Sequence, residues 1–133
     1  MNQSLIEFIP IDALNPHPHN SRIHSPDQVA QIAASIDRFG FRGCILIDED
    51  NIILAGHGRT MAMRHLGRDT IPCQRVTGLT DAEKRAYVIA DNQTAENSEW
   101  DLEIRASELQ HLAAAGIDMA DFGIPAAALQ SLT

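Results

Sequence analysis

The stretch Ile52-Ile53-Leu54-Ala55-Gly56-His57-Gly58-Arg59 decides how this chain folds. Its apolar first half predicts a buried strand, and the two glycines that follow predict a tight turn. Met61, Ala62 and Leu66 then recur at helical spacing, before Gly67 ends the series. The stretch therefore predicts a strand, a glycine turn and a short helix with Arg59 in its first turn.

Three further segments are predicted to be strands. The apolar run 44–47 lies on the other side of Asp48-Glu49-Asp50-Asn51 from the run 52–54, which is typical of a hairpin. Residues 5–9 form a short apolar run that Pro10 ends. Residues 71–76 contain Pro72, which favours a position at the edge of the sheet. The segments predict a small mixed sheet.

Capping boxes predict where three longer helices begin. The first is Ser25-Pro26-Asp27-Gln28, followed by apolar residues on one face as far as Gly40. The second is Thr80-Asp81-Ala82-Glu83, and the third is Ser98-Glu99-Trp100-Asp101. A last helical turn or two is predicted over 125–132. The whole is therefore expected to be a mixed α/β domain of helices around a sheet.

Length and composition limit the class of protein. A chain of 133 residues with 44% hydrophobic residues predicts one globular domain, 1–133. We expect its core within 5–100 and appended helices over 101–133. The sequence has no apolar run long enough for a membrane span, and residues 1–4 do not resemble a signal peptide. These features predict a cytoplasmic protein without a membrane partner.

Charge is distributed unevenly along the chain, whose net charge is −8. Residues 77–133 hold three bases, Lys84, Arg85 and Arg105, against ten acids. Because DNA affinity depends on basic residues that neutralise phosphates, direct binding to DNA is not expected. An anion would instead be held by arginine side chains, backbone amides or helix N-termini.

The glycine turn has two interpretations. Amides at a helix N-terminus favour an anion, and a phosphate beside Arg59 would offset the unfavourable position of that cation. A plain turn with a surface arginine explains the spacing equally well. The P-loop motif and the full G-x-G-x-x-G motif are both absent, which excludes those two nucleotide-binding classes.

The order of several motifs resembles the N-terminal domain of the ParB family, which shares its fold with sulfiredoxin. The segments that carry the resemblance are 9–16, 20–22, 34–41, 53–59, 79–83 and 89–93. The stretch 86–97, with Trp100 and Asp101, is most similar to ParB-like domains of phages and prophages, often fused to a DNA methyltransferase. The resemblance implies a ParB/sulfiredoxin-like fold with a C-terminal helical layer.

The resemblance also implies a nucleotide site, with CTP or ATP and Mg²⁺ as ligands. It assigns phosphate contacts to residues of the early loop, the glycine turn and a later helix: Arg22, Gly56, His57, Gly58, Arg59 and Asn92. It assigns Asp91 and Asn92 to magnesium bound through phosphate. Two family arginines are replaced, by Thr60 and Ala95, which counts against hydrolysis of CTP and against tight binding of a triphosphate. His57 stands where sulfiredoxin has its reactive cysteine, so that activity is not expected.

Three functions follow as hypotheses. The first is a nucleotide-binding module for partitioning, DNA modification or transcription regulation. Such a module would reach DNA through a partner or a fused domain. It would bind a protein partner through the acidic C-terminal helices, and it could form a homodimer. The second is an enzyme, either a weak NTPase, a phosphotransferase or a nuclease, with Asp91, Glu96 or His57 as general base. The third is a protein-interaction domain without a ligand. The six histidines, His17-x-His19 among them, are expected to be solvated rather than zinc-bound.

Overall fold

The computed structural model describes residues 5–20, 22–97 and 99–124. The chain divides into two compact units, Met1–Glu96 and Asn97–Thr133, and each is described by itself. Within the described residues, no helix is long and apolar enough to cross a membrane. That the two units act as one domain stays a prediction.

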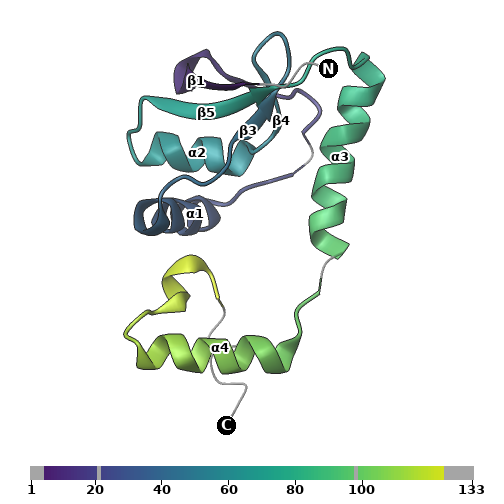
Figure 1. Cartoon of the computed structure of the whole chain (residues 1–133). Coiled ribbons are helices and arrows are strands. Elements are labelled where there is room, and N and C mark those ends of the chain that lie inside the picture. Colours follow the sequence, from purple (N-terminus) through teal and green to yellow (C-terminus); the bar gives the residue numbers. More distant parts are fainter. Residues whose placement is uncertain (1–4, 21, 98, 125–133) are drawn as a thin grey trace. The chain divides into compact units, whose positions relative to one another are not determined.

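The first unit contains a mixed sheet, as predicted, but with five strands where four were predicted (Figure 1). Its strands are β1 (Ile6–Pro10), β2 (Asn15–Pro16), β3 (Ile45–Ile47), β4 (Ile52–Ala55) and β5 (Thr70–Arg75), in the spatial order β1-β5-β3-β4-β2. The hairpin of β3 and β4 is confirmed, with Leu46 opposite Ala55. Its turn is closed by Asp48, whose carboxylate accepts hydrogen bonds from the amides of Asp50 and Ile52 at 2.8 and 2.9 Å.

The predicted edge position of Pro72 is wrong. Its strand, β5, lies inside the sheet, antiparallel to β1 and parallel to β3. Pro72 lies opposite Phe8, and its neighbours Ile71 and Cys73 are fully buried. Burial of these two side chains outweighs the single hydrogen-bond donor that a proline removes from a strand.

Two helices cover one face of the sheet (Figure 1). They are α1 (Pro26–Phe39), whose predicted N-cap Ser25 accepts a hydrogen bond from the Gln28 amide, and α2 (His57–His65). A short 3-10 helix, η1 (Ile11–Ala13), follows β1. The helices and the sheet bury one apolar cluster, which includes Ile36, Ile45, Ile47, Ala62 and Ile71. This core fixes the strand-turn-helix segment in place.

Helix α3 (Asp81–Asn97) begins at the predicted capping box, which is confirmed in both directions. The Thr80 amide donates to the Glu83 carboxylate over 2.9 Å, and the Glu83 amide donates to the Thr80 hydroxyl over 3.1 Å. One turn further on, the Lys84 ammonium lies 2.9 Å from the carboxylate of Asp48. It also contacts Glu49 over 2.6 Å, so α3 is anchored to the β3–β4 turn.

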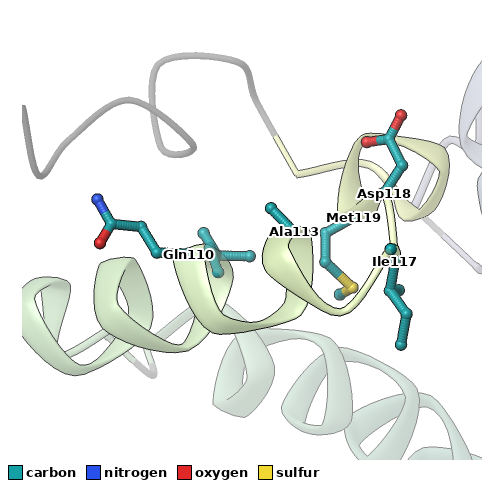
Figure 2. Close-up of a pocket in the computed structure, with 7 residues that line it drawn as sticks. Gln110, Ala113, Ile117, Asp118 and Met119 are labelled. Atoms are coloured by element: carbon teal, nitrogen blue, oxygen red, sulfur yellow. The ribbon is translucent and has the colours of Figure 1, made fainter.

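The second unit contains α4 (Leu102–Ala114) and a 3-10 helix, η2 (Met119–Phe122). The predicted start of α4 at Ser98 is wrong, because Asp101 is its N-cap and accepts a hydrogen bond from the Ile104 amide. A cavity of about 380 Å³ lies between α4 and the segment after it. Figure 2 shows Ala113 and Gln110 on the helix side, and Met119 on the other. The helical turn predicted over 125–132 lies outside the described residues.

Candidate functional site

At both glycines of the turn before α2, a side chain would come too close to neighbouring residues. Gly56 has a φ of 108° and is the N-cap of α2. A side chain there would collide with Ile45, and one at Gly58 would lie 2.9 Å from Cε1 of His24. The amides of the first helical turn, from His57 to Arg59, have no acceptor within the helix and carry the positive end of its dipole. The turn therefore presents donors toward the space beside it.

A cavity of about 430 Å³ opens at this point. It is enclosed by the early loop, α1, the glycine turn and α3. The structure brings together all the residues that the sequence assigned to phosphate or metal, and they line this cavity: Arg22, Gly56, His57, Gly58, Arg59, Asp91 and Asn92. Sequence reasoning gave no site role to four other residues that line it, Asn20, His24, Gln28 and Ile32.

Arg59 is held by the protein itself. Its guanidinium donates hydrogen bonds to the carbonyl oxygens of Arg42 and Cys44, over 3.1 and 2.9 Å. Its Cζ atom lies 4.9 Å from the ring centre of Phe41, a cation–π contact. Burial lowers the pKa of Arg59, although the guanidinium stays charged. These acceptors offset the unfavourable position of a cation at a helix N-terminus, so a bound anion is not needed to explain it.

Thr60 stands where the family pattern has a second arginine, and it serves the turn. Its hydroxyl donates to the Gly56 carbonyl over 2.9 Å, and its amide donates to the same oxygen over 2.9 Å. The side chain is buried. Position 60 therefore closes the first turn of α2 and presents no charge to the cavity.

His57 is a neutral acceptor in this structure. Its Nε2 atom accepts a hydrogen bond from the His17 amide over 3.0 Å, which places the ring proton on Nδ1. Burial, together with the charges of His24 and His17, lowers the pKa of His57 to about 4. An imidazole in this state adds no positive charge to a phosphate site, and its Nε2 lone pair is already engaged.

The prediction that the histidines are solvated is wrong for His17, which is 6% exposed. Its Nδ1 atom accepts a hydrogen bond from the His19 amide over 3.1 Å, which folds the proline-rich loop around it. Burial lowers the pKa of His17. His24 also has a partner, since its Nδ1 atom lies 3.0 Å from the Gln28 amide oxygen. His24 therefore lines the cavity, and His17 contacts it only through its hydrogen bond with His57.

Asp91 and Asn92, the predicted magnesium residues, do not by themselves make up a complete set of metal ligands. Asp91 is exposed, and the Asn92 amide donates to the Val88 carbonyl of its own helix over 3.0 Å. In the part of the chain that the structure describes, no three His, Cys, Asp or Glu side chains are grouped to hold a metal ion. Mg²⁺ commonly binds one or two carboxylates together with substrate phosphates. Asp91 can supply one such carboxylate.

A second cavity of about 360 Å³ adjoins the first and shares Asn20, Arg22, His24 and His57 with it. The remaining walls are mainly apolar, with Pro16, Ile53 and Met61, together with Thr60 and Arg64. The guanidinium of Arg64 donates to the Ile11 carbonyl over 3.1 Å. The combined site thus has one polar end with arginines and backbone amides, and one more apolar end.

Comparison with known proteins decides the family. The family model of the ParB N-terminal domain matches residues 1–93. This chain belongs to the ParB N-terminal domain family. The ParB-like nuclease domain-containing protein YnaK of Escherichia coli (strain K12) is 46% identical over 80 residues, which are 60% of this chain and 92% of that protein.

Solved structures of ParB proteins and of sulfiredoxin have the same fold. The C-terminally truncated chromosome-partitioning protein ParB from Caulobacter crescentus, complexed with CTP-gamma-S, superposes with a TM-score of 0.72 at 19% identity, covering 87% of this chain and 67% of that one. Sulfiredoxin from Arabidopsis thaliana gives 0.53 at 23% identity, covering 63% and 97%. The predicted ParB/sulfiredoxin-like fold is confirmed.

Cys73 is buried, which raises the pKa of its thiol to about 11, and neither cysteine lines the two cavities.

Proposed function

We propose that this ParB-like domain binds a nucleoside triphosphate, CTP or ATP, as a module of a DNA-associated system. The observation that carries the proposal is the cavity where Arg22, Arg59 and the first turn of α2 converge. Arginine side chains and helix N-termini are the groups that bind phosphate without a lysine. The Caulobacter crescentus ParB of the same fold, solved with CTP-gamma-S, supports the choice of CTP.

The residues divide the binding work between them. Gly56 and Gly58 let phosphate oxygens approach the amides of the turn, and Arg59, already fixed by two carbonyl oxygens, offers its remaining N–H groups without further ordering. Arg22 closes the polar end from the early loop. Mg²⁺ bound with the nucleotide would neutralise phosphate charge, and Asp91, which lines the cavity with Asn92, would hold it.

The proposal also covers the partners. The net charge of −8 opposes direct contact with DNA, so the domain acts on DNA through a partner or a fused domain, such as a methyltransferase of a phage or prophage. The Caulobacter crescentus ParB complexed to the centromeric parS site, with a TM-score of 0.56 at 18% identity, supports a role near DNA. The acidic C-terminal helices would bind a protein partner, and two copies of the domain would form a homodimer. The protein would act in the cytoplasm.

A second candidate is an enzyme, and the similarity to YnaK, a ParB-like nuclease domain-containing protein, favours testing it. His57 is a poor general base, because its Nε2 atom already accepts the His17 hydrogen bond. Asp91 is an exposed carboxylate at the cavity and is the better placed base. Turnover that depends on Asp91 would therefore identify an NTPase, phosphotransferase or nuclease.

Calorimetric titration and thermal unfolding with CTP, ATP and GTP, each with Mg²⁺, test the proposal. A ligand at about one hundred times its Kd adds about 2.7 kcal/mol to the free energy of unfolding. We expect stabilisation by CTP or ATP that Arg22→Ala removes. Arg38→Ala is the matched control, because Arg38 is an exposed arginine of α1 outside the cavity.

Arg59→Ala needs a separate control, since this side chain also holds the segment before β3. Its unliganded form should melt at a lower temperature, so its affinity is measured by calorimetry well below that temperature. Nucleotide binding unaffected by both Arg22→Ala and Arg59→Ala would contradict the proposed site. No response to any nucleotide would favour a protein-interaction domain.

A further inference from the structure

The C-terminal unit buries few apolar side chains. Among its described residues, 99–124, the buried hydrophobic side chains are those of Ala106 and Leu109. Trp100, Leu102 and Ile104 are 64%, 64% and 63% exposed. Units of fewer than about 40 residues usually need a disulfide, a metal or a partner to stay folded. Exposed apolar side chains at this density indicate a surface that another molecule covers.

Trp100 and Ile104 line a groove of about 400 Å³ whose exposed lining is mostly apolar. Ile104, Glu108 and Leu112 follow one another at intervals of four residues and therefore form one stripe along α4. Met119 and Ile124 form part of the lining after the helix. Leu109 and Met119 also line the cavity of Figure 2, so they separate the two hollows.

One aromatic ring at the groove contacts an arginine side chain. The guanidinium carbon of Arg105 lies 4.9 Å from the centre of the Trp100 ring, a cation–π contact. Both residues line the groove. A large apolar ring held in place and exposed is the kind of residue that contributes most to protein interfaces.

The charge around the groove selects the occupant. Residues 97–133 contain six acids and one base, Arg105, which gives a formal net charge of −5. Asp101 and Glu108 line the groove, seven residues or about 10 Å apart along α4. A second copy would bring the same negative charge, and DNA or an anionic lipid surface would be repelled as well. A partner with basic residues next to apolar ones fits this arrangement.

We infer that the groove binds an amphipathic helix of a partner protein, with apolar residues along its centre and lysine or arginine at its margins. The inference rests on the part of the proposed function that gives the C-terminal helices a protein partner, and it is independent of the nucleotide. Apolar side chains of the partner helix fill the space between Ile104 and Leu112. Its basic residues, two helical turns apart, face Asp101 and Glu108.

Trp100 is the only tryptophan of the chain, so its fluorescence reports on the groove alone. The probes are three synthetic peptides of about five helical turns: an amphipathic helix with leucine on one face and lysine elsewhere, the same peptide with glutamate for lysine, and a scrambled lysine peptide. We expect the lysine helix to shift Trp100 emission to shorter wavelength, saturably, and to protect it from acrylamide. The other two peptides should leave the emission unchanged.

Variants of the full chain locate the binding. Ile104→Glu should weaken binding of the lysine helix at least tenfold, and Glu108→Lys should weaken it severalfold while allowing the glutamate helix to bind. Ile89→Glu is the control, since Ile89 is an exposed apolar residue of α3 outside the groove. Circular dichroism establishes that each variant keeps its helices.

Three results would overturn the inference. They are equal binding of the lysine and glutamate helices, no emission change with either, and emission of the free chain already protected from acrylamide. In the last case, sedimentation tells a second copy from the chain's own residues as occupant. The nucleotide titration of Ile104→Glu separates the two proposals, because this variant should bind nucleotide as the unmodified chain does.

Discussion

The His17 backbone amide donates a hydrogen bond to the His57 ring over 3.0 Å, between residues 40 positions apart in the chain. It joins the proline-rich loop to the glycine turn, the two segments that border both cavities at this site. The bond requires a neutral His57 ring, because a protonated imidazole has no lone pair to accept it. Loop and turn are therefore coupled through the protonation of one side chain.

Stability should fall as the solution is acidified through the range in which His57 is kept neutral. Its pKa is about 4 in the folded chain against 6.5 ordinarily, so the unfolded chain binds the proton first. The contribution is complete above about pH 6.5 and is lost as the pH falls toward 4. Because His57 is partly exposed, we expect about 1 kcal/mol, measured by urea unfolding at pH 7.5 and pH 5.

His57→Gln keeps an acceptor but cannot be protonated, so it should reduce this dependence on pH. His111→Gln removes an exposed histidine of α4 and serves as the control. An unchanged difference between pH 7.5 and pH 5 in His57→Gln would show that other groups cause it.

Alanine at the two glycines of the turn should have different effects. Gly56→Ala combines a positive φ with a collision against Ile45 in the core, and we expect a loss of more than about 3 kcal/mol in the free energy of unfolding. Gly58→Ala meets the movable ring of His24 and Cδ1 of Ile32 at 3.1 Å, so a smaller loss of about 1 kcal/mol is expected. Chemical unfolding measures both.

Gly67→Ala is the control for backbone strain, because Gly67 has a φ of 71° and open space around it. It should cost about 1 kcal/mol, the usual cost of the left-handed conformation. If Gly56→Ala cost no more than Gly67→Ala, the close approach of the turn to β3 would be refuted.

Removing the Asp48 carboxylate should destabilise the chain more than neutralising it. In Asp48→Ala, the amides of Asp50 and Ile52 lose their acceptor and the Lys84 ammonium keeps only Glu49, so we expect a loss of about 2–3 kcal/mol. Asp48→Asn keeps one oxygen for the turn amides, so its loss should be smaller. Equal losses in the two variants would mean that the charge, not the turn, determines the stability of this hairpin.

The interactions of Asp48 and Glu49 with Lys84 should also make the chain easier to unfold in acid. Burial would raise the pKa of Asp48, but hydrogen bonds from the Ile52 amide, the Lys84 ammonium and the Asp50 amide outweigh it and lower that pKa. The hydrogen bond from Lys84 also lowers the pKa of Glu49. Stability from a lowered carboxyl pKa is present above the ordinary value, about 4, and is lost as the pH falls below it.

Urea unfolding between pH 6 and pH 3 measures this loss, and Lys84→Met should make it smaller. Arg85→Met, which removes an exposed neighbour with a longer contact of 3.9 Å to Asp81, is the control. If Lys84→Met left the dependence of the unfolding free energy on pH unchanged, other carboxylates, such as Glu7 beside Arg75, would cause the acid sensitivity.

Local patterns predicted the elements of this fold well where the signal is local. The turn residues 48–51 between two apolar runs predicted the β3–β4 hairpin, and the Thr80 and Ser25 caps predicted two helix starts. The third start was wrong because Asp101 competes with Ser98 as an N-cap, and both residues suit that position. The position of Pro72 depends on which strands pair, which is set by the core as a whole.

Seven of the residues that line the cavity were named from the sequence, but their contacts were not. Arg59 looked unpartnered because the carbonyls of Arg42 and Cys44 that hold it belong to a segment 15 and 17 residues earlier, and backbone acceptors leave no trace in a sequence. Sequence reasoning assigned His24 and Gln28 no role in binding, and only the packing around Gly58 shows that they line the cavity. A sequence can show which side chains are present, whereas tertiary packing decides which groups they meet.

The anchor of α3 has a practical consequence for labelling. Lys84 is the only lysine of the chain, and its ammonium is held between Asp48 and Glu49. An acylating reagent therefore finds a single side-chain amine, whose nucleophilic lone pair is suppressed while those carboxylates stabilise its protonated form. The rate of acylation at this one position thus reports how often the helix detaches from the hairpin.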